Sequence, residues 1–151
     1  MLIGVISDTH GLLRPEAVAA LRGAEHILHA GDIGAPEVLA ALAEIAPVTA
    51  VRGNNDQGGW AGRLPATAVF EAGGFSIYVL HDLGDLDLDP AAAGFGVVVA
   101  GHSHKPGQDR RGGVLYFNPG SAGPRRFSLP ICLGLLHVTG GHARAELVSL
   151  A

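Results

Sequence analysis

The chain has 151 residues, of which 48% are hydrophobic and 16% charged, and its net charge is −4 at neutral pH. This length and composition are typical of one globular domain, so we predict a single domain over residues 1–151. Ten Lys and Arg residues against 14 Asp and Glu leave no broad basic surface, which argues against a long nucleic acid as the substrate.

The amino-terminal residues do not resemble a targeting segment. The apolar start at Met1 has no basic region, and it reaches Asp8 too early for a signal peptide. No apolar run approaches the length of a membrane span. The single cysteine, Cys132, lies between Ile131 and Leu133 and is expected to be a buried small side chain. We therefore expect a cytoplasmic protein with no membrane partner.

The first third of the chain alternates strands and helices. Apolar runs predict strands over residues 2–7, 26–30 and 48–52. Pro15 and Pro36 open Ala- and Leu-rich segments that predict helices ending at Gly23 and at about Ile45. These elements form two βαβ units, which predict parallel pairing of the three strands.

The rest of the chain predicts mainly strands. Residues 68–71 and 75–80 flank a Gly-Gly turn, as do residues 131–138 and 143–150, so each pair predicts a β-hairpin. Residues 97–100 and 114–117 predict further strands, and Pro90 to Ala93 a short helix. The order βαβαβ, followed by mostly antiparallel strands, predicts an α/β fold whose mixed sheets are covered by helices.

Polar side chains follow five of the predicted strands. These residues are Asp8, Asp32, Asn54, His81 and His102. Side chains at the carboxyl ends of strands converge on the ligand crevice of open α/β sheets, so these residues can meet in space. Together with His10 and His104 they offer carboxylate, amide and imidazole groups without a thiolate. That set of donors favours a hard-to-borderline metal site.

Seven candidate ligands exceed the needs of one zinc-like ion. They suit two ions that share a carboxylate, and Asp32 can bridge because each of its oxygens can serve one ion. The pairs Asp8 with His10 and His102 with His104 have a spacing of two residues, so both side chains of a pair can aim at one site. Three of the ligands are preceded by glycine, which permits close backbone approach: Gly31, Gly53 and Gly101.

Taken in order, these motifs resemble those of the calcineurin-like metallophosphoesterases. The matching motifs are Asp8-Thr9-His10, Gly31-Asp32, Gly53-Asn54-Asn55-Asp56, His81 and Gly101-His102-Ser103-His104. The chain is most similar to the small single-domain prokaryotic phosphodiesterases of that family, and Asn118-Pro119-Gly120-Ser121 resembles a further signature of theirs. The resemblance runs from residue 5 to residue 127 and implies a sandwich of two mixed β-sheets flanked by helices.

The resemblance also implies a centre with two divalent metal ions. The implied ligands are Asp8, His10 and His104 on one ion, Asn54, His81 and His102 on the other, and Asp32 between the two. A hydroxide that bridges the ions would attack phosphorus in line, with Asp32 and Asn54 as catalytic residues. We expect manganese, and iron, zinc and nickel are the alternatives.

Two positions depart from the family pattern. Many relatives carry a histidine after the metal-binding Asn, where it can protonate the leaving group. This chain has Asn55, which is no acid at ordinary pH. We therefore hypothesise substrates whose leaving groups need little protonation, or protonation through water. Asp82 stands where relatives commonly have glycine, either as the partner of a ligand or as a solvated side chain.

Three residues near the Asn54 motif are candidates for substrate binding. They are Asn55, Asp56 and Arg63. For Asp56 we favour hydrogen bonds to the loop that presents Asn54 over direct substrate contact. The Asn118-Pro119-Gly120-Ser121 motif has the composition of a turn, and we interpret it as support for the site.

The predicted function is a metal-dependent phosphoesterase, specifically a phosphodiesterase acting on a small phosphoester or nucleotide. The alternatives are a phosphomonoesterase or nucleotidase of the same mechanism, or a metal-binding scaffold for protein interaction, because the family fold also occurs in a retromer subunit. The complete ligand set favours the enzyme. A nuclease is disfavoured by charge, although short single strands need little basic surface. The resemblance is also consistent with a homo-oligomer.

Overall fold

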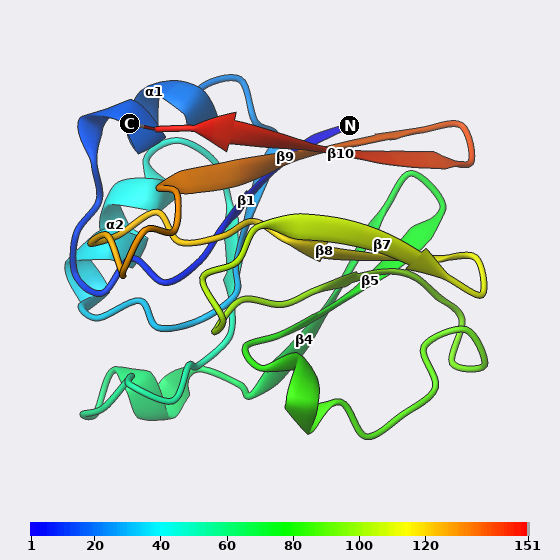
Figure 1. Ribbon diagram of the computed structural model, residues 1–151, viewed down its shortest axis with the longest axis horizontal. Coiled ribbons are helices and arrows are strands. Elements are labelled where there is room, and N and C mark those ends of the chain that lie inside the picture. The colour runs from blue at the N-terminus through cyan, green and yellow to red at the C-terminus, as the bar shows by residue number, and fades with distance from the viewer. Residues whose placement is uncertain (151) are drawn as a thin grey trace.

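Two five-stranded β-sheets pack face to face, with two α-helices beside them (Figure 1). The computed structural model describes residues 1–150. The elements in chain order are β1 (Leu2–Ile6), α1 (Pro15–Leu21), β2 (His26–His29), α2 (Pro36–Ala43), β3 (Val48–Ala50), the 3-10 helix η1 (Ala61–Arg63), β4 (Thr67–Ala72), β5 (Phe75–Leu80), the 3-10 helix η2 (Leu83–Asp85), β6 (Phe95–Val99), β7 (Gly107–Arg111), β8 (Val114–Asn118), β9 (Cys132–Thr139) and β10 (His142–Ser149). The predicted α/β sandwich of mixed sheets is confirmed.

The first sheet has the strand order β10-β9-β1-β2-β3. Its strands β1, β2 and β3 are parallel, with Ile3 beside His26 and Ile27 beside Val48. This pairing confirms the prediction from the two βαβ units. β9 is antiparallel to both β1 and β10, and with β10 it forms the predicted closing hairpin.

The second sheet has the order β4-β5-β6-β8-β7. β4 and β5 form the predicted hairpin, and β7 pairs antiparallel with β8 at the far edge. β5, β6 and β8 are parallel to one another. Parallel pairing therefore extends into the part of the chain where the sequence predicts mostly antiparallel strands.

The main hydrophobic core lies between the two sheets. Val5 and Leu28 of the first sheet pack in one cluster with Val79, Val99 and Phe117 of the second. Each of these side chains is at most 2% exposed. They alternate with outward-facing residues along their strands, because successive side chains of a strand point to opposite faces.

Both α-helices cover the outer face of the first sheet. Leu21 of α1 and Leu42 of α2 are fully buried against Ile6, Ile27 and Leu133. Each helix begins with a proline, whose missing N–H breaks no helical hydrogen bond in the first turn. Figure 1 shows the two helices gathered on one side of the molecule.

The outer face of the second sheet is covered by a loop segment, residues 82–94. Tyr78, Leu80 and Val98 of the sheet pack against Leu83 and Leu86 of this segment. The short helix predicted at Pro90 to Ala93 is wrong, because these residues form a turn. The Ala93 N–H donates to Asp89 O at 2.9 Å, and Gly94 follows with a left-handed φ of 87°, a conformation that ends a helix.

Three further elements are absent from the sequence prediction, namely the edge strand β7 and the 3-10 helices η1 and η2. None of the helices within residues 1–150 is long and apolar enough to cross a membrane.

Candidate metal centre

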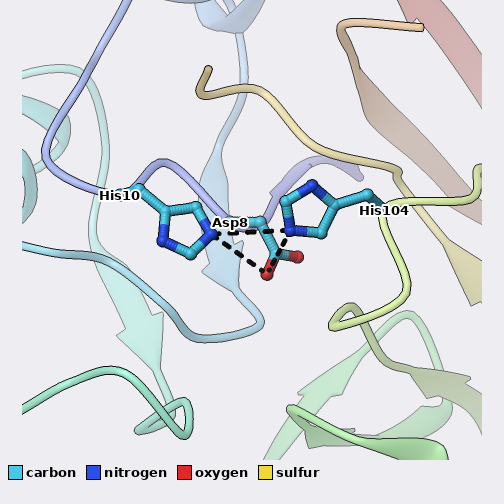
Figure 2. Close-up of side chains that lie close together, drawn as sticks. All are labelled: Asp8, His10 and His104. Carbon is cyan, nitrogen blue, oxygen red and sulfur yellow. Dashed lines mark hydrogen bonds and ion pairs between the residues drawn. The ribbon is translucent and has the colours of Figure 1, made fainter. Parts of the chain in front are cut away.

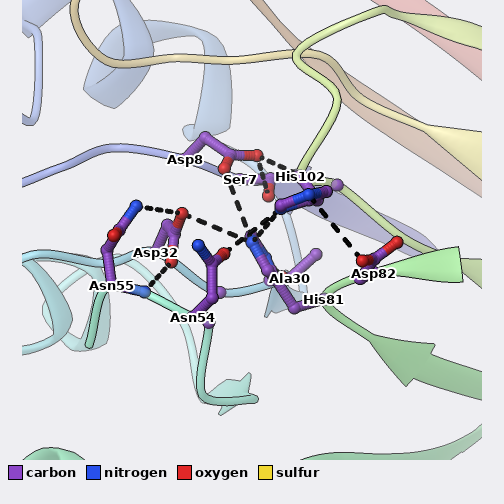
Figure 3. Close-up of polar contacts among 12 residues, drawn as sticks. Ser7, Asp8, Ala30, Asp32, Asn54, Asn55, His81, Asp82 and His102 are labelled. Atoms are coloured by element: carbon purple, nitrogen blue, oxygen red, sulfur yellow. Dashed lines mark hydrogen bonds and ion pairs between the residues drawn. The ribbon is translucent and has the colours of Figure 1, made fainter. Parts of the chain in front are cut away.

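The seven predicted ligands lie at the carboxyl ends of parallel strands from both sheets. Asp8 and His10 follow β1, Asp32 follows β2, Asn54 follows β3, His81 follows β5, and His102 and His104 follow β6. Backbone hydrogen bonds connect these loops, since the Asp8 N–H donates to Gly31 O and the Gly101 N–H donates to His81 O. The structure brings the seven side chains together in one cluster (Figures 2 and 3).

Asp8 is fully buried, and its two carboxylate oxygens have different surroundings. Oδ2 accepts hydrogen bonds from Ser7 Oγ at 2.7 Å and from the His102 N–H at 3.1 Å. Oδ1 accepts no hydrogen bond within residues 1–150. Three imidazole Nε2 atoms surround it at 3.3 to 3.9 Å, those of His104, His10 and His81. Hydrogen bonds thus fix Oδ2, while Oδ1 faces imidazole nitrogens of the kind that bind metal ions.

His10 and His104 complete one side of the centre (Figure 2). Their Nε2 atoms lie 3.5 Å apart, and the His104 side chain is buried while that of His10 is 23% exposed. One ligand atom from each of Asp8, His10 and His104 lies within 4.8 Å of the other two. This is the group that the family resemblance implies for one ion.

His81 turns its Nε2 toward the centre. Its Nδ1 lies 2.7 Å from Ala30 O, and since a carbonyl only accepts, Nδ1 carries the proton. In the neutral ring, Nε2 then presents its lone pair to Asp32 Oδ2 at 3.3 Å (Figure 3). A lone pair that faces a carboxylate requires a proton or a cation between them. Ligand atoms of Asp8, Asp32 and His81 lie within 4.8 Å of one another, so a cation fits there.

The protonation of Asp32 and His81 reflects this pairing. Burial opposes the charge on Asp32, but the hydrogen bonds from His81 and from the Asn55 N–H lower the pKa of Asp32 to about 2. Burial also disfavours the charged form of His81, but the hydrogen bonds to Asp32 and Ala30 O raise the pKa of His81. Asp32 is therefore ionised at neutral pH, which is the form that binds a metal.

His102 lies between the centre and Asp82 (Figure 3). Its Nδ1 is 3.2 Å from Asn54 Oδ1 and 3.3 Å from His81 Nε2. Its Nε2 is 3.7 Å from Asp82 Oδ2. The imidazole of His102 therefore points its Nδ1 toward the centre. Asp82 lies on the opposite side of the ring, where its carboxylate can fix the ring orientation.

Five of the seven predicted ligands have left-handed backbone conformations. Their φ angles lie between 47° and 71°, and they are Asp8, His10, Asp32, His102 and His104. This region costs a residue with a side chain on the order of 1–3 kcal/mol. Such strain persists only where the surrounding structure fixes it, and it is concentrated here at the candidate centre.

Two of the glycines before the ligands are required by close contacts. A Cβ at Gly101 would collide with Ser7 Oγ and would lie 2.7 Å from Asp8 Oδ2. A Cβ at Gly53 would collide with the backbone nitrogen and Oδ1 of Asp32. Glycine at both positions therefore permits the carboxylates to sit against the neighbouring backbone.

The three candidates for substrate binding lie in different surroundings. Asn55 donates to both oxygens of Asp32, from its N–H at 2.8 Å and from Nδ2 at 3.1 Å. The buried Asp56 accepts three backbone N–H groups, among them that of Gly53 at 2.9 Å, so it does hydrogen-bond the loop that presents Asn54. Arg63 is exposed at the end of η1. A substrate role for these residues stays a prediction.

Other side chains fix the loops that carry the predicted ligands. The sequence predicts a supporting role for some of these side chains but not for all. Ser7 holds Asp8, as described above, and no sequence signal singles it out. Ser121 Oγ donates to Asp8 O at 3.1 Å, and Asn118 Nδ2 donates to Gly101 O at 3.2 Å. These two contacts agree with the interpretation of the Asn118 to Ser121 motif as support for the site.

The residues present fit a divalent metal. A buried carboxylate oxygen without a hydrogen bond is costly, and Asp8 Oδ1 is such an atom within the described part of the chain. A cation among the three nearby imidazole nitrogens would offset that cost. Carboxylate, imidazole and amide donors are suitable ligands for manganese, iron, zinc and nickel.

Comparisons with known proteins agree with the family resemblance. The calcineurin-like phosphoesterase superfamily domain matches residues 1–141. The chain is 36% identical over 160 residues to a probable metallophosphoesterase of Methanothermobacter thermautotrophicus, with 98% of this chain and 92% of that protein covered.

Solved structures share the fold. A novel archaeal phosphodiesterase superposes with a TM-score of 0.82 at 22% identity, covering 98% of this chain and 100% of that one. Vps29 from Entamoeba histolytica, complexed with Zn²⁺, superposes with a TM-score of 0.74 at 24% identity, covering 100% of both chains. Since the family match covers nearly the whole chain, this protein belongs to the calcineurin-like phosphoesterase superfamily of metal-dependent enzymes.

Proposed function

We propose that this chain is a phosphodiesterase that depends on two divalent metal ions. The proposed ligands are the seven residues described above, with Asp8, His10 and His104 on one side, Asn54, His81 and His102 on the other, and Asp32 between them. Manganese is our expectation for the metal. The substrate class is a small phosphoester or nucleotide, and residues 1–151 act as one domain.

The observation that carries this proposal is the environment of Asp8 Oδ1. This buried oxygen has no hydrogen bond within residues 1–150, and three imidazole Nε2 atoms face it at 3.3 to 3.9 Å. A structural carboxylate would be paired with donors, as Asp56 is with three backbone N–H groups. The contrast between the two buried aspartates supports a cation site at Asp8.

When bound, the ions would neutralise charge on the phosphoryl oxygens and lower the pKa of a water molecule. The chain's own residues hold this centre in shape. Asn55 orients the Asp32 carboxylate through two hydrogen bonds, and Ser7 orients that of Asp8. The Oδ1 of Asn54 faces His102, which leaves its Nδ2 group free to donate elsewhere. We assign this Nδ2 as a hydrogen-bond donor to a phosphoryl oxygen in the transition state.

No side chain at position 55 can give a proton to the leaving group. Asn55 cannot act as an acid, and its amide already donates to Asp32 Oδ2 at 3.1 Å. Esters with good leaving groups are therefore the favoured substrates, and poorer ones would take their proton from water.

The test is hydrolysis of a chromogenic aryl phosphodiester and of its monoester counterpart. Metal-stripped protein is reconstituted with manganese, iron, zinc or nickel, and bound metal is counted by elemental analysis. We expect two ions per chain, a diester rate above the monoester rate, and loss of both rates in Asp32→Asn and His104→Ala. His137→Ala, which changes a histidine outside the centre that pairs with Glu146, serves as the matched control.

Two outcomes would contradict the proposal. If no ion supports turnover of either ester although metal binds, the enzyme proposal is wrong and the centre belongs to a scaffold. A higher rate on the monoester would instead identify a phosphomonoesterase of the same mechanism.

A further inference from the structure

An apolar pocket lies on the outer face of the second sheet, directly beside the metal centre. Its cavity of about 340 Å³ falls within the range of about 300–1,000 Å³ that small-molecule sites occupy. Its lining includes Val98, Ala100, Tyr116 and Leu83, and we call it the apolar pocket. No α-helix covers this sheet face within residues 1–150, and the segment of residues 82–94 that packs on it supplies Leu83 to the wall of the pocket.

The apolar pocket shares a wall with the centre. His102 lines the pocket, and its Nδ1 lies 3.3 Å from His81 Nε2 in the centre. Ser103 and Asn118 line the same side, and Asn118 Nδ2 donates to Ser103 Oγ at 3.1 Å. A group seated in the pocket is therefore adjacent to a phosphoryl group bound at the centre, and one molecule can occupy both.

The polar groups at the rim are already paired. Arg111 Nε donates to Asp109 Oδ2 at 2.9 Å, and its guanidinium carbon lies 4.7 Å from the centroid of the Tyr116 ring. Gln108 Nε2 donates to Ala145 O at 3.1 Å. Because Asp109 balances the charge of Arg111, the pocket does not favour an anion such as a second phosphate. Arg111 and Tyr116 together present flat groups, against which an aromatic ring of a ligand can pack.

A second pocket, which shares Asp82 with the apolar pocket, has more carboxylates in its lining. Its cavity is about 490 Å³, and it is lined by Asn54, Asp82, Asp85, Asp87 and Arg52 among others. We call it the acidic pocket. Carboxylates are poorly matched to an apolar ring, which would leave them desolvated and unpaired. The two pockets therefore differ in the kind of group that they can accept.

We propose that the apolar pocket binds a flat, uncharged ring, such as an aryl group or a nucleobase, that is linked to the phosphoryl group of the substrate. This inference rests on the proposed phosphoesterase function and names the chemical class of one ester group. Tyr116 and Leu83 are the residues that determine this specificity. The ring enters beside His102 while the phosphoryl group lies at the metals.

The first experiment compares two anions that differ only in a ring. Zinc-loaded protein is titrated in a calorimeter with phenylphosphonate and with methylphosphonate, neither of which is hydrolysed. We expect the phenyl compound to bind about threefold to tenfold more tightly, as stacking and burial of a ring allow. Tyr116→Ala and Leu83→Ala should abolish this preference and leave the affinity for methylphosphonate unchanged.

Two variants serve as controls for the pocket. Tyr116→Phe retains the ring, and Thr67→Ala changes a residue that lines the acidic pocket. Both should keep the preference for the phenyl compound. Equal affinities in the unmodified protein, or a preference that survives both alanine variants, would overturn the inference.

A second experiment separates this inference from the proposed function. If neither phosphonate binds, the phosphoryl site is wrong, and the pocket is then tested alone with phenol and with adenosine. Amide NMR shifts at Gly101, Ser103 and Gly107 of metal-free protein upon addition of either ring would support the pocket. No shift with either would overturn it, and would favour a protein partner for this sheet face.

Discussion

The two carboxylate oxygens of Asp82 face different groups, the backbone of η2 and the imidazole of His102. Its Oδ1 caps η2 by accepting the Gly84 N–H at 2.9 Å, and its Oδ2 lies 3.7 Å from His102 Nε2. A carboxylate behind an imidazole fixes the ring orientation and makes its other nitrogen a better ligand. We predict that Asp82→Asn, which keeps an oxygen for the cap, weakens metal binding by about tenfold or more.

Competition with a chromophoric chelator measures that affinity. Asp85→Asn, a change in the same 3-10 helix, is the matched control and should leave the affinity unchanged. If Asp82→Asn binds metal as tightly as the unmodified protein, Asp82 is only a solvated cap.

Asn55 is the residue that leaves this chain without an acid after Asn54, one of the proposed ligands. We predict that Asn55→His improves turnover of esters with poor leaving groups, because a positioned acid contributes about 10²-fold or more to such steps. Turnover of a nitrophenyl ester should change little.

The dependence of kcat on the pKa of the leaving group measures this effect. Asn55→Ala is the control, since it removes the hydrogen bond to Asp32 Oδ2 without supplying an acid. A histidine variant that behaves like the alanine variant on poor leaving groups would refute our account of position 55.

Strand β2 ends in a histidine that the fold holds neutral. Thr9 Oγ1 donates to Ile33 O at 2.8 Å, so the His29 Nε2–H must donate to Thr9 Oγ1 at 3.0 Å. The Gly31 N–H donates to His29 Nδ1 at 3.1 Å. Burial, followed by the nearby charge of His81, lowers the pKa of His29 to about 3.

This histidine makes the fold sensitive to acid. The ordinary pKa of histidine, about 6.5, applies to the unfolded chain, which therefore binds a proton between about pH 6.5 and pH 3 that the folded chain does not. Below about pH 6.5, the free energy of unfolding should fall by up to about 1.4 kcal/mol per pH unit from this group. Urea unfolding of chelator-treated protein at pH 7.5 and 5.5 measures the change.

His29→Gln removes the titrating group, so its stability should depend less on pH over this range. The comparison isolates His29 from His81, whose raised pKa acts in the opposite direction. Equal pH dependence in the two proteins would show that His29 does not control acid stability.

The elements that sequence reasoning finds are those with an apolar pattern. β5 is predicted with its exact bounds, Phe75–Leu80, because it is an apolar run that follows a Gly-Gly turn. β7 has the sequence Gly-Gln-Asp-Arg-Arg and is mostly exposed, so its strand conformation comes from pairing with β8 and leaves no hydrophobic signal. Residues Pro90 to Ala93 form only a turn, because the left-handed Gly94 that follows stops the chain from continuing as a helix.

The structure brings the predicted ligands together, and their role in metal binding stays a prediction. Their residue types recur at strand ends, where topology alone brings side chains together. Ser7 and Thr9 are not predicted to be supports, because hydroxyls that bond locally are common everywhere in a sequence. Which oxygen of Asp8 faces the histidines, and which nitrogen of His102 faces Asp82, depends on side-chain rotation that no spacing encodes.

For the whole molecule, metal binding should raise thermal stability. An ion that binds only the folded chain adds about 2.7 kcal/mol at a hundredfold excess over its Kd. In a domain of this size, that corresponds to an increase in Tm of about 5 to 10 °C. Scanning calorimetry of chelator-treated protein, with and without added manganese, measures it.

His104→Ala should lose most of this increase, because its Nε2 lies 3.3 Å from Asp8 Oδ1. His137→Ala should keep it, since His137 lies outside the centre and pairs with Glu146. An increase that survives in His104→Ala would place the stabilising ion elsewhere.

The left-handed backbone at five of the seven proposed ligands has a consequence for how this protein evolves. Glycine would relieve the strain at each of these positions, so a lineage selected for stability alone would gain by replacing them. Aspartate and histidine persist there against the conformational preference of the chain. We therefore expect relatives that do not bind metal to carry substitutions at these positions first.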